Sequence, residues 1–594
     1  MLKAVTELGI AYGDRWDASE KFVTDIGRSY VHELAIVLKK SEGLITYLGT
    51  QLRKRADRKY LFREKKGNFS VPFSLTLRDA GKGAGPIVEK FINFGCKDAP
   101  PLARNVSKVL EENRARLVDE LEKLPLAVQK NERKFYTVVI ECNGEELYPG
   151  EIDEFRDVFL RRVSQEAKDY DGTCYLCGLV TRVGHKASDI FKFSSFDKPG
   201  FAYMINDANY YINLPVCRDC FANLSVGKKI MDSYLNLNFY ASNVYIIPRF
   251  VGGTVSQKKN LKSKIETVEN LKNLKDALLR DDNPYKTFEL YALEYLKARD
   301  IYTTFNFVFY TLKNNEMKIH LSIMDVPPSV IESTRQAKKT VERQLWPLFS
   351  TRDYQPEVLL KPLYQAFSGN RVKSFFDYVE AVFKGKSISL APLKKAVLDS
   401  VASRKLKGEK FATFAKQLLT VCFFIDRVTN RNEGGEERVA STWEELLENH
   451  FTRYSSFFKT SEEKLAFVIG MIHARISQFQ RAKGVSSTVD LKVKAYNMRP
   501  TDFRNHLLDL KWKLTQYRKT MDEQMAGPIY RLLQIAGKYL VDAGKDWRTS
   551  VEDLNYSFLA GEISSGVLRK PQETESQPEE GEGGTYDEHY QEQA

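Results

Sequence analysis

Two pairs of cysteines, each spaced as Cys-x-x-Cys, constrain this chain more than any other feature. The first pair is Cys174 and Cys177, and the second is Cys217 and Cys220. Each C-x-x-C turn brings two thiolates together, and two such turns supply the four ligands of a tetrahedral zinc site. Gly178 follows the first pair, where such a turn often needs a residue that accepts a positive φ. We therefore expect these four cysteines to bind Zn²⁺.

The expected zinc is structural. Four protein ligands close the coordination shell and leave no position for a catalytic water. His185 lies between the pairs and is an alternative ligand, although four cysteines already suffice. Metal-binding thiols must stay reduced, which predicts a cytoplasmic protein without a disulfide framework. The longest obvious apolar run, residues 418–425, is too short to span a bilayer, so we expect no membrane partner.

The charge of the chain is unevenly distributed. The 594 residues carry a net charge of +12. The tail, residues 571–594, contains eight acidic residues and no Lys or Arg, so the remaining chain carries +20. A basic body favours polyanionic partners, of which nucleic acid is the commonest, although solubility alone also explains such a charge.

We expect an α+β fold: a mixed α/β N-terminal region with an inserted four-cysteine zinc-ribbon-like module, followed by an all-α C-terminal helical bundle. The predicted domains, in chain order, are a mixed α/β N-terminal domain (1–164), a zinc-binding insertion (165–225), an α/β continuation with a β-hairpin (226–354), a helical connector (355–440), a four-helix bundle resembling a small subunit (441–570) and a disordered acidic tail (571–594).

Local patterns predict individual elements. Residues 29–39 and 103–124 read as helices, and residues 135–141 read as a strand that ends at the turn Asn143-Gly144. Residues 305–324 read as a β-hairpin. Residues 258–280 form a basic amphipathic helix candidate.

Two apolar seams at helical spacing predict the C-terminal bundle. The seams consist of Leu465, Ile469, Ile472, Ile476 and Phe479, and of Phe503, Leu507, Leu510, Leu514, Tyr517 and Met521. Residues 528–540 and 547–559 supply two further helices, and four helices with short connections form a bundle.

Basic residues gather in two places that are candidates for nucleic-acid binding. The first set lies within fourteen residues and consists of Arg53, Lys54, Arg55, Arg58, Lys59, Arg63, Lys65 and Lys66. Tyr60 and Phe62 lie among them, and aromatic rings beside cations can stack on bases while the cations meet phosphate. A charged helix face followed by a loop is the alternative.

The second set lies on the predicted bundle. Residues 491–519 contain eight Lys or Arg and two Asp, and Arg504, Lys511 and Arg518 recur every seven residues. On a helix this spacing forms one basic stripe beside the apolar seam, which suits contact with a phosphate backbone. Lys258 and Lys259, at the start of the basic helix candidate, are further candidate contacts.

Motifs of catalysis are missing from the sequence, and we expect no enzyme. There is no phosphate-binding G-x-x-x-x-G-K-[ST] loop, no G-x-S-x-G and no H-E-x-x-H. Glu141, Glu145 and Glu146 are carboxylates that could hold Mg²⁺ in a nuclease, although surface acids are the commoner explanation. A metal-dependent nuclease and a stand-alone zinc-ribbon regulator that binds nucleic acid are the two alternatives.

The order of these parts resembles a known family. The sequence from Gly172 to Gly178, the pair Cys217-Arg-Asp-Cys220 and the run Ile323-Met-Asp-Val-Pro-Pro328 resemble the large subunit of type I-B CRISPR interference (Cascade) complexes. The resemblance spans about residues 1–565 and rests on the architecture more than on any one motif.

The resemblance implies a non-catalytic subunit of a crRNA-guided antiviral complex. Such a subunit would help recognise the motif that flanks the target in duplex DNA (the PAM), stabilise the R-loop and recruit the helicase–nuclease. The implied partners are crRNA, target double-stranded DNA, and the backbone, crRNA 5′-end-binding and small subunits. In this subtype the small subunit can arise by internal initiation, for which Met471 and Met498 are candidate starts.

Overall fold

The structure is a computed structural model of the whole chain. It describes the chain apart from residues 14–16, 18, 24–25, 27–29, 63–72, 77–83, 94–98, 125–133, 166–169, 192–213, 241, 251–268, 270–302, 314–315, 352–353, 368–371, 430–439, 441, 486–488, 494 and 565–594. The chain divides into two compact units. Unit 1 comprises residues 1–282 and 298–325, and unit 2 comprises residues 283–297 and 326–594.

The first sheet of unit 1 has five strands. Strand β1 (His32–Ser41) pairs with β2 (Leu44–Lys54) in antiparallel and with β4 (Lys134–Cys142) in parallel orientation. The short strands β3 (Ser74–Thr76) and β5 (Glu145–Leu147) both pair antiparallel with β4. The sheet therefore has β1 and β4 at its centre.

The sequence patterns around this sheet were partly misleading. The helix predicted over residues 29–39 is wrong, because residues 32–39 belong to β1. Six successive residues of β1, from 33 to 38, are buried, since a central strand covered on both faces reads as a continuous apolar run. The strand predicted over residues 135–141 is confirmed as β4, and Asn143 and Gly144 turn the chain at φ of 53° and 85°.

Four helices accompany the first sheet: α2 (Ala84–Ile92), α3 (Pro101–Glu112), α4 (Arg114–Lys123) and α5 (Asp153–Gln165). One helix predicted over residues 103–124 is two helices, because Asn113 adopts φ −103° and ψ 16° between them. Both α3 and α4 contact β2.

The second sheet of unit 1 has four strands in the order β11-β10-β9-β8. They are β8 (Asn236–Phe239), β9 (Ser242–Phe250), β10 (Thr303–Lys313) and β11 (Glu316–Val326). The last two strands confirm the hairpin predicted over residues 305–324, although its turn at residues 314–315 lies outside the described residues.

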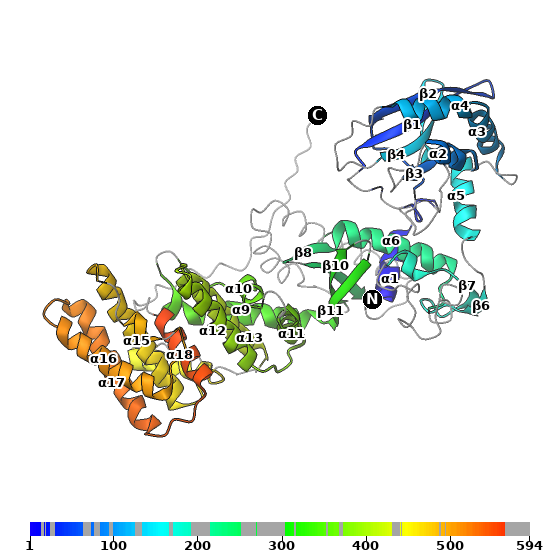
Figure 1. Cartoon of the computed structure of the whole chain (residues 1–594). Coiled ribbons are helices and arrows are strands. Elements are labelled where there is room, and N and C mark those ends of the chain that lie inside the picture. The colour runs from blue at the N-terminus through cyan, green and yellow to red at the C-terminus, as the bar shows by residue number, and fades with distance from the viewer. Residues whose placement is uncertain are drawn as a thin grey trace, which may run out of the picture. The chain divides into compact units, whose positions relative to one another are not determined.

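Helices α1 (Leu2–Tyr12) and α6 (Arg218–Tyr234) pack against each other and contact β9 of this sheet (Figure 1). Glycines make the close approach possible, because a Cβ on Gly9 would overlap the carbonyl oxygen of Asn223 and a Cβ on Gly227 would overlap that of Val5. The first helix thus joins the second sheet, whereas the sequence grouped it with the N-terminal α/β domain.

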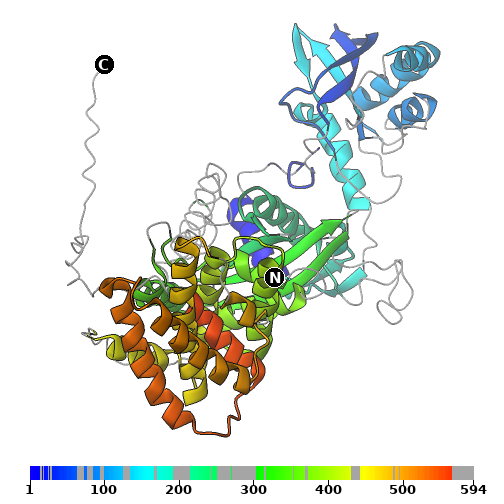
Figure 2. The same cartoon turned by 60° about the vertical axis from the view of Figure 1, so that its left-hand side comes forward.

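The described part of unit 2 is helical, as Figure 2 shows in the part of the chain coloured from yellow-green to red. Its α-helices are α9 (Pro328–Phe349), α10 (Lys361–Ala366), α11 (Val372–Lys384), α12 (Ala391–Leu406), α13 (Ala412–Thr429), α14 (Trp443–Arg453), α15 (Ser461–Ala482), α16 (Pro500–Tyr517), α17 (Glu523–Ala543) and α18 (Val551–Ile563). The predicted connector is packed into the unit, since α12 and α13 both contact α18.

Helix α15 is the centre of the C-terminal bundle and contacts α16, α17 and α18. All five residues of its predicted seam are buried, and so are Phe503, Leu507, Leu510 and Leu514 of α16. Thr460 and Glu463 form a capping box at the start of α15. A Cβ on Gly470 of α15 would overlap the carbonyl oxygen of Phe558, so α15 and α18 lie almost backbone to backbone.

Several predictions fall outside the described residues. They are the basic helix of residues 258–280, except residue 269, and the acidic tail of residues 571–594. In the part of the chain that the structure describes, no helix combines the length and the apolar composition needed to cross a membrane.

Candidate metal centre and nucleic-acid interface

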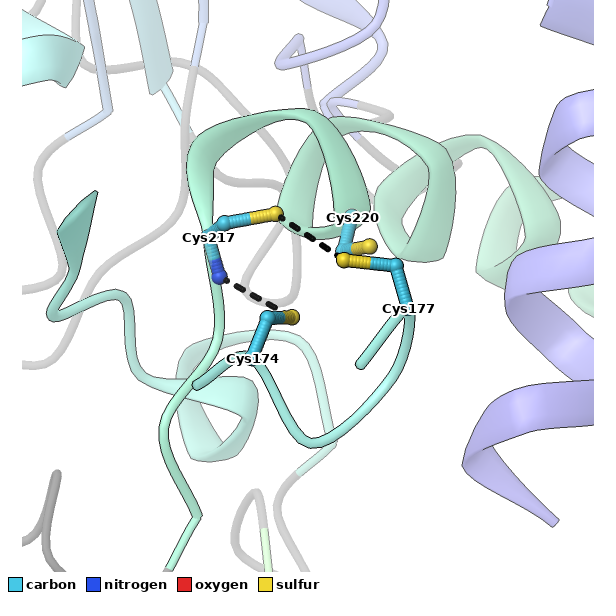
Figure 3. A group of neighbouring side chains, drawn as sticks. All are labelled: Cys174, Cys177, Cys217 and Cys220. Carbon is cyan, nitrogen blue, oxygen red and sulfur yellow. Dashed lines mark hydrogen bonds between the residues drawn. The ribbon is translucent and has the colours of Figure 1, made fainter. Parts of the chain in front are cut away.

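The four cysteines predicted as ligands come together from two elements of unit 1. Cys174 and Cys177 lie on the turn between strands β6 (Tyr170–Thr173) and β7 (Val180–Val183), and Cys217 and Cys220 lie at the start of α6. Their sulfur atoms all lie within 4.8 Å of one another (Figure 3). Three of the four are buried, and Cys177 is exposed.

Backbone hydrogen bonds fix the turn that carries the first pair. The amide of Gly178 donates to the carbonyl of Cys174 at 2.8 Å, and the amide of Cys174 donates to the carbonyl of Leu179 at 2.9 Å. Gly178 adopts φ of +76°, and the space around its Cα is open. Glycine is therefore favoured here by the backbone conformation rather than by crowding.

The protonation of the cluster depends on backbone donors and on neighbouring sulfurs. Burial alone would raise the pKa of Cys174, but the amides of Cys177, Cys217 and Leu176 outweigh it and lower that pKa to about 7. The amide of Cys217 donates to Cys174 Sγ at 3.4 Å. Burial raises the pKa of Cys217 to about 11 and raises that of Cys220 further, and the nearby Cys174 sulfur adds to both shifts. A bound cation would stabilise all four sulfurs as thiolates.

This arrangement can hold one metal ion with four protein ligands. Cys177 Sγ and Cys217 Sγ lie 4.0 Å apart, as two ligands of one ion do. His185 does not join the cluster: its ring stacks on Phe221 at 4.8 Å between centroids. Among the described residues, no other set of at least three His, Cys, Asp or Glu side chains gathers in this way.

The first basic segment is only partly available to a partner. Arg53 donates to Glu33 at 2.9 Å, to Glu146 at 2.8 Å and to Tyr148 at 2.8 Å. The Glu33 side chain is fully buried and also accepts from Tyr60 and Tyr148. Arg53 therefore neutralises a buried carboxylate, and its guanidinium is committed to this network.

The aromatic residues of this segment do not face solvent, which contradicts the expected stacking on bases. Tyr60 and Phe62 are both buried in a core cluster, and their rings pack edge-on against Phe135. Leu61 between them is buried as well, so residues 60–62 belong to the core.

The remaining cations of the segment surround a cavity of about 250 Å³. Arg55, Arg58 and Lys59 line it, together with Lys229 of α6. Lys59 pairs with Glu20 at 2.7 Å and Arg58 with Glu151 at 3.4 Å, whereas Lys54 is exposed beside them. Arg63, Lys65, Lys66, Lys258 and Lys259 lie outside the described residues.

The three cations of the predicted stripe have different environments. Arg504 donates to the carbonyls of Gly544 and Lys545 and lies over the Trp547 ring at 5.0 Å, so it fastens the end of α17. Lys511 and Arg518 are exposed. The sequence did not reveal that Leu508 and Trp512 are also exposed on α16, at 65% and 58%.

The carboxylates considered for a nuclease site are held in the β4–β5 hairpin. Glu141 and Glu146 are paired across the two strands, and Glu145 is exposed at the turn. Glu146 is ion-paired with Arg53 at 2.8 Å. In the described residues these three carboxylates do not form a metal-holding group.

Comparison with protein families assigns most of the chain to one family. Residues 1–161 match the model of the N-terminal domain of CRISPR-associated protein TM1802, residues 171–326 match its central domain and residues 358–575 match its C-terminal domain. The central match ends where unit 1 gives way to unit 2. No curated protein matches the chain.

Proposed function

The chain belongs to the CRISPR-associated TM1802 family, and from this premise we propose that it is the large, non-catalytic subunit of a crRNA-guided type I-B interference complex. In this role it helps recognise the PAM in duplex DNA, stabilises the R-loop and recruits the helicase–nuclease. Because the guide reads the target by base pairing, the protein needs only contacts to a duplex edge and to phosphates. Family membership is the observation that carries the proposal.

The four-cysteine cluster supports a structural Zn²⁺ in this subunit. Zinc–sulfur bonds of about 2.3 Å in a tetrahedron place the sulfurs about 3.8 Å apart, close to the 4.0 Å between Cys177 and Cys217. Cys174, Cys177, Cys217 and Cys220 would hold the ion and complete its shell. Zinc would join the β6–β7 turn to the start of α6, and this small module would gain the stability that its limited core does not supply.

Exposed cations support a role in binding nucleic acid. Lys511 and Arg518 lie exposed on α16 and at its end, and Lys54 is exposed at the end of β2. The net charge of +20 outside the acidic tail would attract a phosphate backbone, and that attraction weakens with salt. The expected partners are crRNA, target duplex DNA, the other subunits of the complex and the helicase–nuclease, all in the cytoplasm.

The C-terminal bundle bears on the origin of a small subunit. A product that starts at Met471 would lack the first half of α15, including Gly470, where α15 meets α18. A product that starts at Met498 would retain α16, α17 and α18. Both would expose apolar residues of the bundle, so either product would need a partner surface to cover them.

Charge reversal on α16 tests the nucleic-acid-binding role. In the assembled complex, Lys511→Glu with Arg518→Glu should weaken target DNA binding and reduce its salt dependence, because two phosphate contacts are lost. The matched control is Lys108→Glu with Lys123→Glu, an equal change of charge at exposed lysines of α3 and α4. Affinities measured at two salt concentrations test this prediction. Equal binding by both double variants would refute the assignment of a nucleic-acid contact to α16.

A further inference from the structure

A second cavity of unit 1, of about 380 Å³, lies beside the metal cluster and has no role in the account so far. It is lined by Met1, Leu2, Lys3, Ala4, Tyr175, Arg249, Asn306, Met324 and Asp325. These residues come from α1, from the cysteine turn and from the neighbouring strands β9, β10 and β11. Its size falls in the roughly 300–1,000 Å³ range of ligand pockets.

Asn306 supplies a buried hydrogen-bond donor without a partner. Its side chain is 1% exposed, and its Oδ1 accepts from the amide of Asp325 at 2.9 Å. Because the Asp325 amide is a donor, it must face the oxygen of the Asn306 carboxamide, and the NH₂ group points away from it. Nδ2 has no hydrogen-bond partner among the described residues. A buried unpaired donor costs on the order of 1–3 kcal/mol, so a ligand that accepts from it would gain affinity.

Asp325 supplies an acceptor next to this donor. Its φ of +56° lies in the left-handed region, a conformation that costs energy outside glycine and often marks a functional position. Arg249 holds Asp325 Oδ1 at 2.6 Å, and Thr304 lies 3.4 Å from the same oxygen. Oδ2 makes no hydrogen bond within the part of the chain that the structure describes. Asn306 and Asp325 both line the cavity, and the hydrogen bond between them holds them together.

An aromatic ring, two cationic side chains and the amino terminus of Met1 border the same cavity. Tyr175 is 53% exposed, and Lys3 Nζ lies 5.6 Å from the centre of its ring. The Arg249 side chain is half exposed. Aromatic rings stack on nucleobases, and Lys and Arg side chains meet phosphates. Tyr175 directly follows the ligand Cys174, and its amide donates to the carbonyl of Pro215 at 2.8 Å, so the metal-bound turn would hold this ring in place.

From these features we propose that the cavity binds one unstacked nucleotide of a single-stranded nucleic acid. The base stacks on Tyr175, its edge accepts a hydrogen bond from Asn306 Nδ2 and donates one to Asp325 Oδ2, and its phosphate meets Lys3 and Arg249. Every nucleobase carries an adjacent donor and acceptor on its pairing edge that fits Asn306 and Asp325. The exposed Tyr175 ring beside two cationic side chains favours a nucleotide over a peptide. The inference rests on the proposed nucleic-acid-binding function and assigns it a site.

Photocrosslinking with the purified full-length chain tests the proposal. The probes are ten-nucleotide single-stranded DNA and RNA that carry one 5-iodouracil, and the adduct is mapped by mass spectrometry. We expect it at Tyr175. Tyr175→Leu should remove the adduct and weaken binding about tenfold or more, as loss of one stacked base does. Asn306→Ser should weaken binding as well. A probe with an abasic nucleotide at the crosslinked position should bind wild type and Tyr175→Leu equally.

Tyr530→Leu is the matched control, because Tyr530 is a comparably exposed tyrosine on α17. Metal content should be the same for wild type and for all three variants, and thermal unfolding should be the same for wild type, Tyr175→Leu and Tyr530→Leu. Adducts that map elsewhere, with unchanged affinity of Tyr175→Leu, would overturn the nucleotide site and leave the proposed function intact. If neither DNA nor RNA binds the wild-type chain at low salt, the nucleotide site and the proposed nucleic-acid-binding function are both refuted. Binding of a poly-glutamate peptide that requires Tyr175, without oligonucleotide binding there, would identify a protein partner instead.

Discussion

At the scale of single residues, the charge of a side chain does not reveal what it contacts. Arg53 and Lys54 are neighbours in the same basic segment, yet Arg53 is bound to Glu33, Glu146 and Tyr148 while Lys54 is exposed. The difference follows from strand periodicity, which turns successive side chains of β2 to opposite faces. The buried Glu33 cannot be seen as a partner in the sequence, because β1 and β2 must first pair in the right register.

Replacing Arg53 should therefore affect folding more than binding. Arg53→Met leaves the Glu33 carboxylate buried without its cation, which should lower the free energy of unfolding by about 3 kcal/mol. Lys54→Met is the control and should change it by no more than about 0.5 kcal/mol. Denaturant unfolding of the two variants measures the difference, and equal stabilities would show that the Glu33 network does not depend on Arg53.

The same scale explains why the pocket of Asn306 was not predicted. Its parts come from positions 3, 175, 249, 306 and 325, which no local pattern connects. The run Ile323-Met-Asp-Val-Pro-Pro328 stood out in the sequence as part of a resemblance, but only the structure shows that Met324 and Asp325 line a cavity. The four cysteines could be predicted because ligand type and spacing carry the chemistry by themselves.

At the scale of elements, prediction succeeded where apolar residues recur at one regular spacing over a long segment. The seams of α15 and α16 were read correctly because a helix buried on one side repeats apolar residues at three and four positions. Residues 29–39 were misread because a strand covered on both faces shows a continuous apolar run, which a short helix can share. The close pairing of α1 with α6 depends on glycines at positions 9 and 227, whose role is visible only when both helices are placed.

The contact between α1 and α6 gives a prediction about glycine. Gly227→Ala should destabilise unit 1 by about 1–3 kcal/mol, because the new methyl group overlaps the carbonyl oxygen of Val5. Gly537→Ala on α17 is the control: nothing lies within 4 Å, so the gain in helix propensity should stabilise the protein by about 1 kcal/mol. Thermal unfolding of the two variants tests this prediction. A stabilising Gly227→Ala would contradict the close packing of α1 against α6.

The metal-binding turn gives a second prediction at this scale. Cys174→Ser should abolish stoichiometric zinc and unfold the β6–β7 turn with the start of α6, since zinc binding at such a site stabilises folding by on the order of 10 kcal/mol. Cys142→Ser, at a half-buried cysteine outside the cluster, should keep its zinc. Elemental analysis and hydrogen exchange over residues 170–191 and 214–225 measure both effects. A Cys174→Ser protein with wild-type exchange in these segments would refute the structural role.

At the scale of the whole molecule, the sequence indicated the fold class and the family, and the structure shows which side chains contact one another and which are exposed. The α+β fold with a four-cysteine cluster and a helical C-terminal region is confirmed. The chain is a CRISPR-associated protein, as its resemblance implied.

The central claim is that this chain works as a subunit bound to guide RNA. The most direct measurement is to purify the tagged full-length chain from its native cells, sequence the RNA that accompanies it and identify the accompanying proteins. We predict CRISPR repeat-derived guide RNA together with the other subunits of the complex. A chain that binds a defined duplex without any guide RNA, or that cleaves nucleic acid on its own with Mg²⁺, would contradict the account.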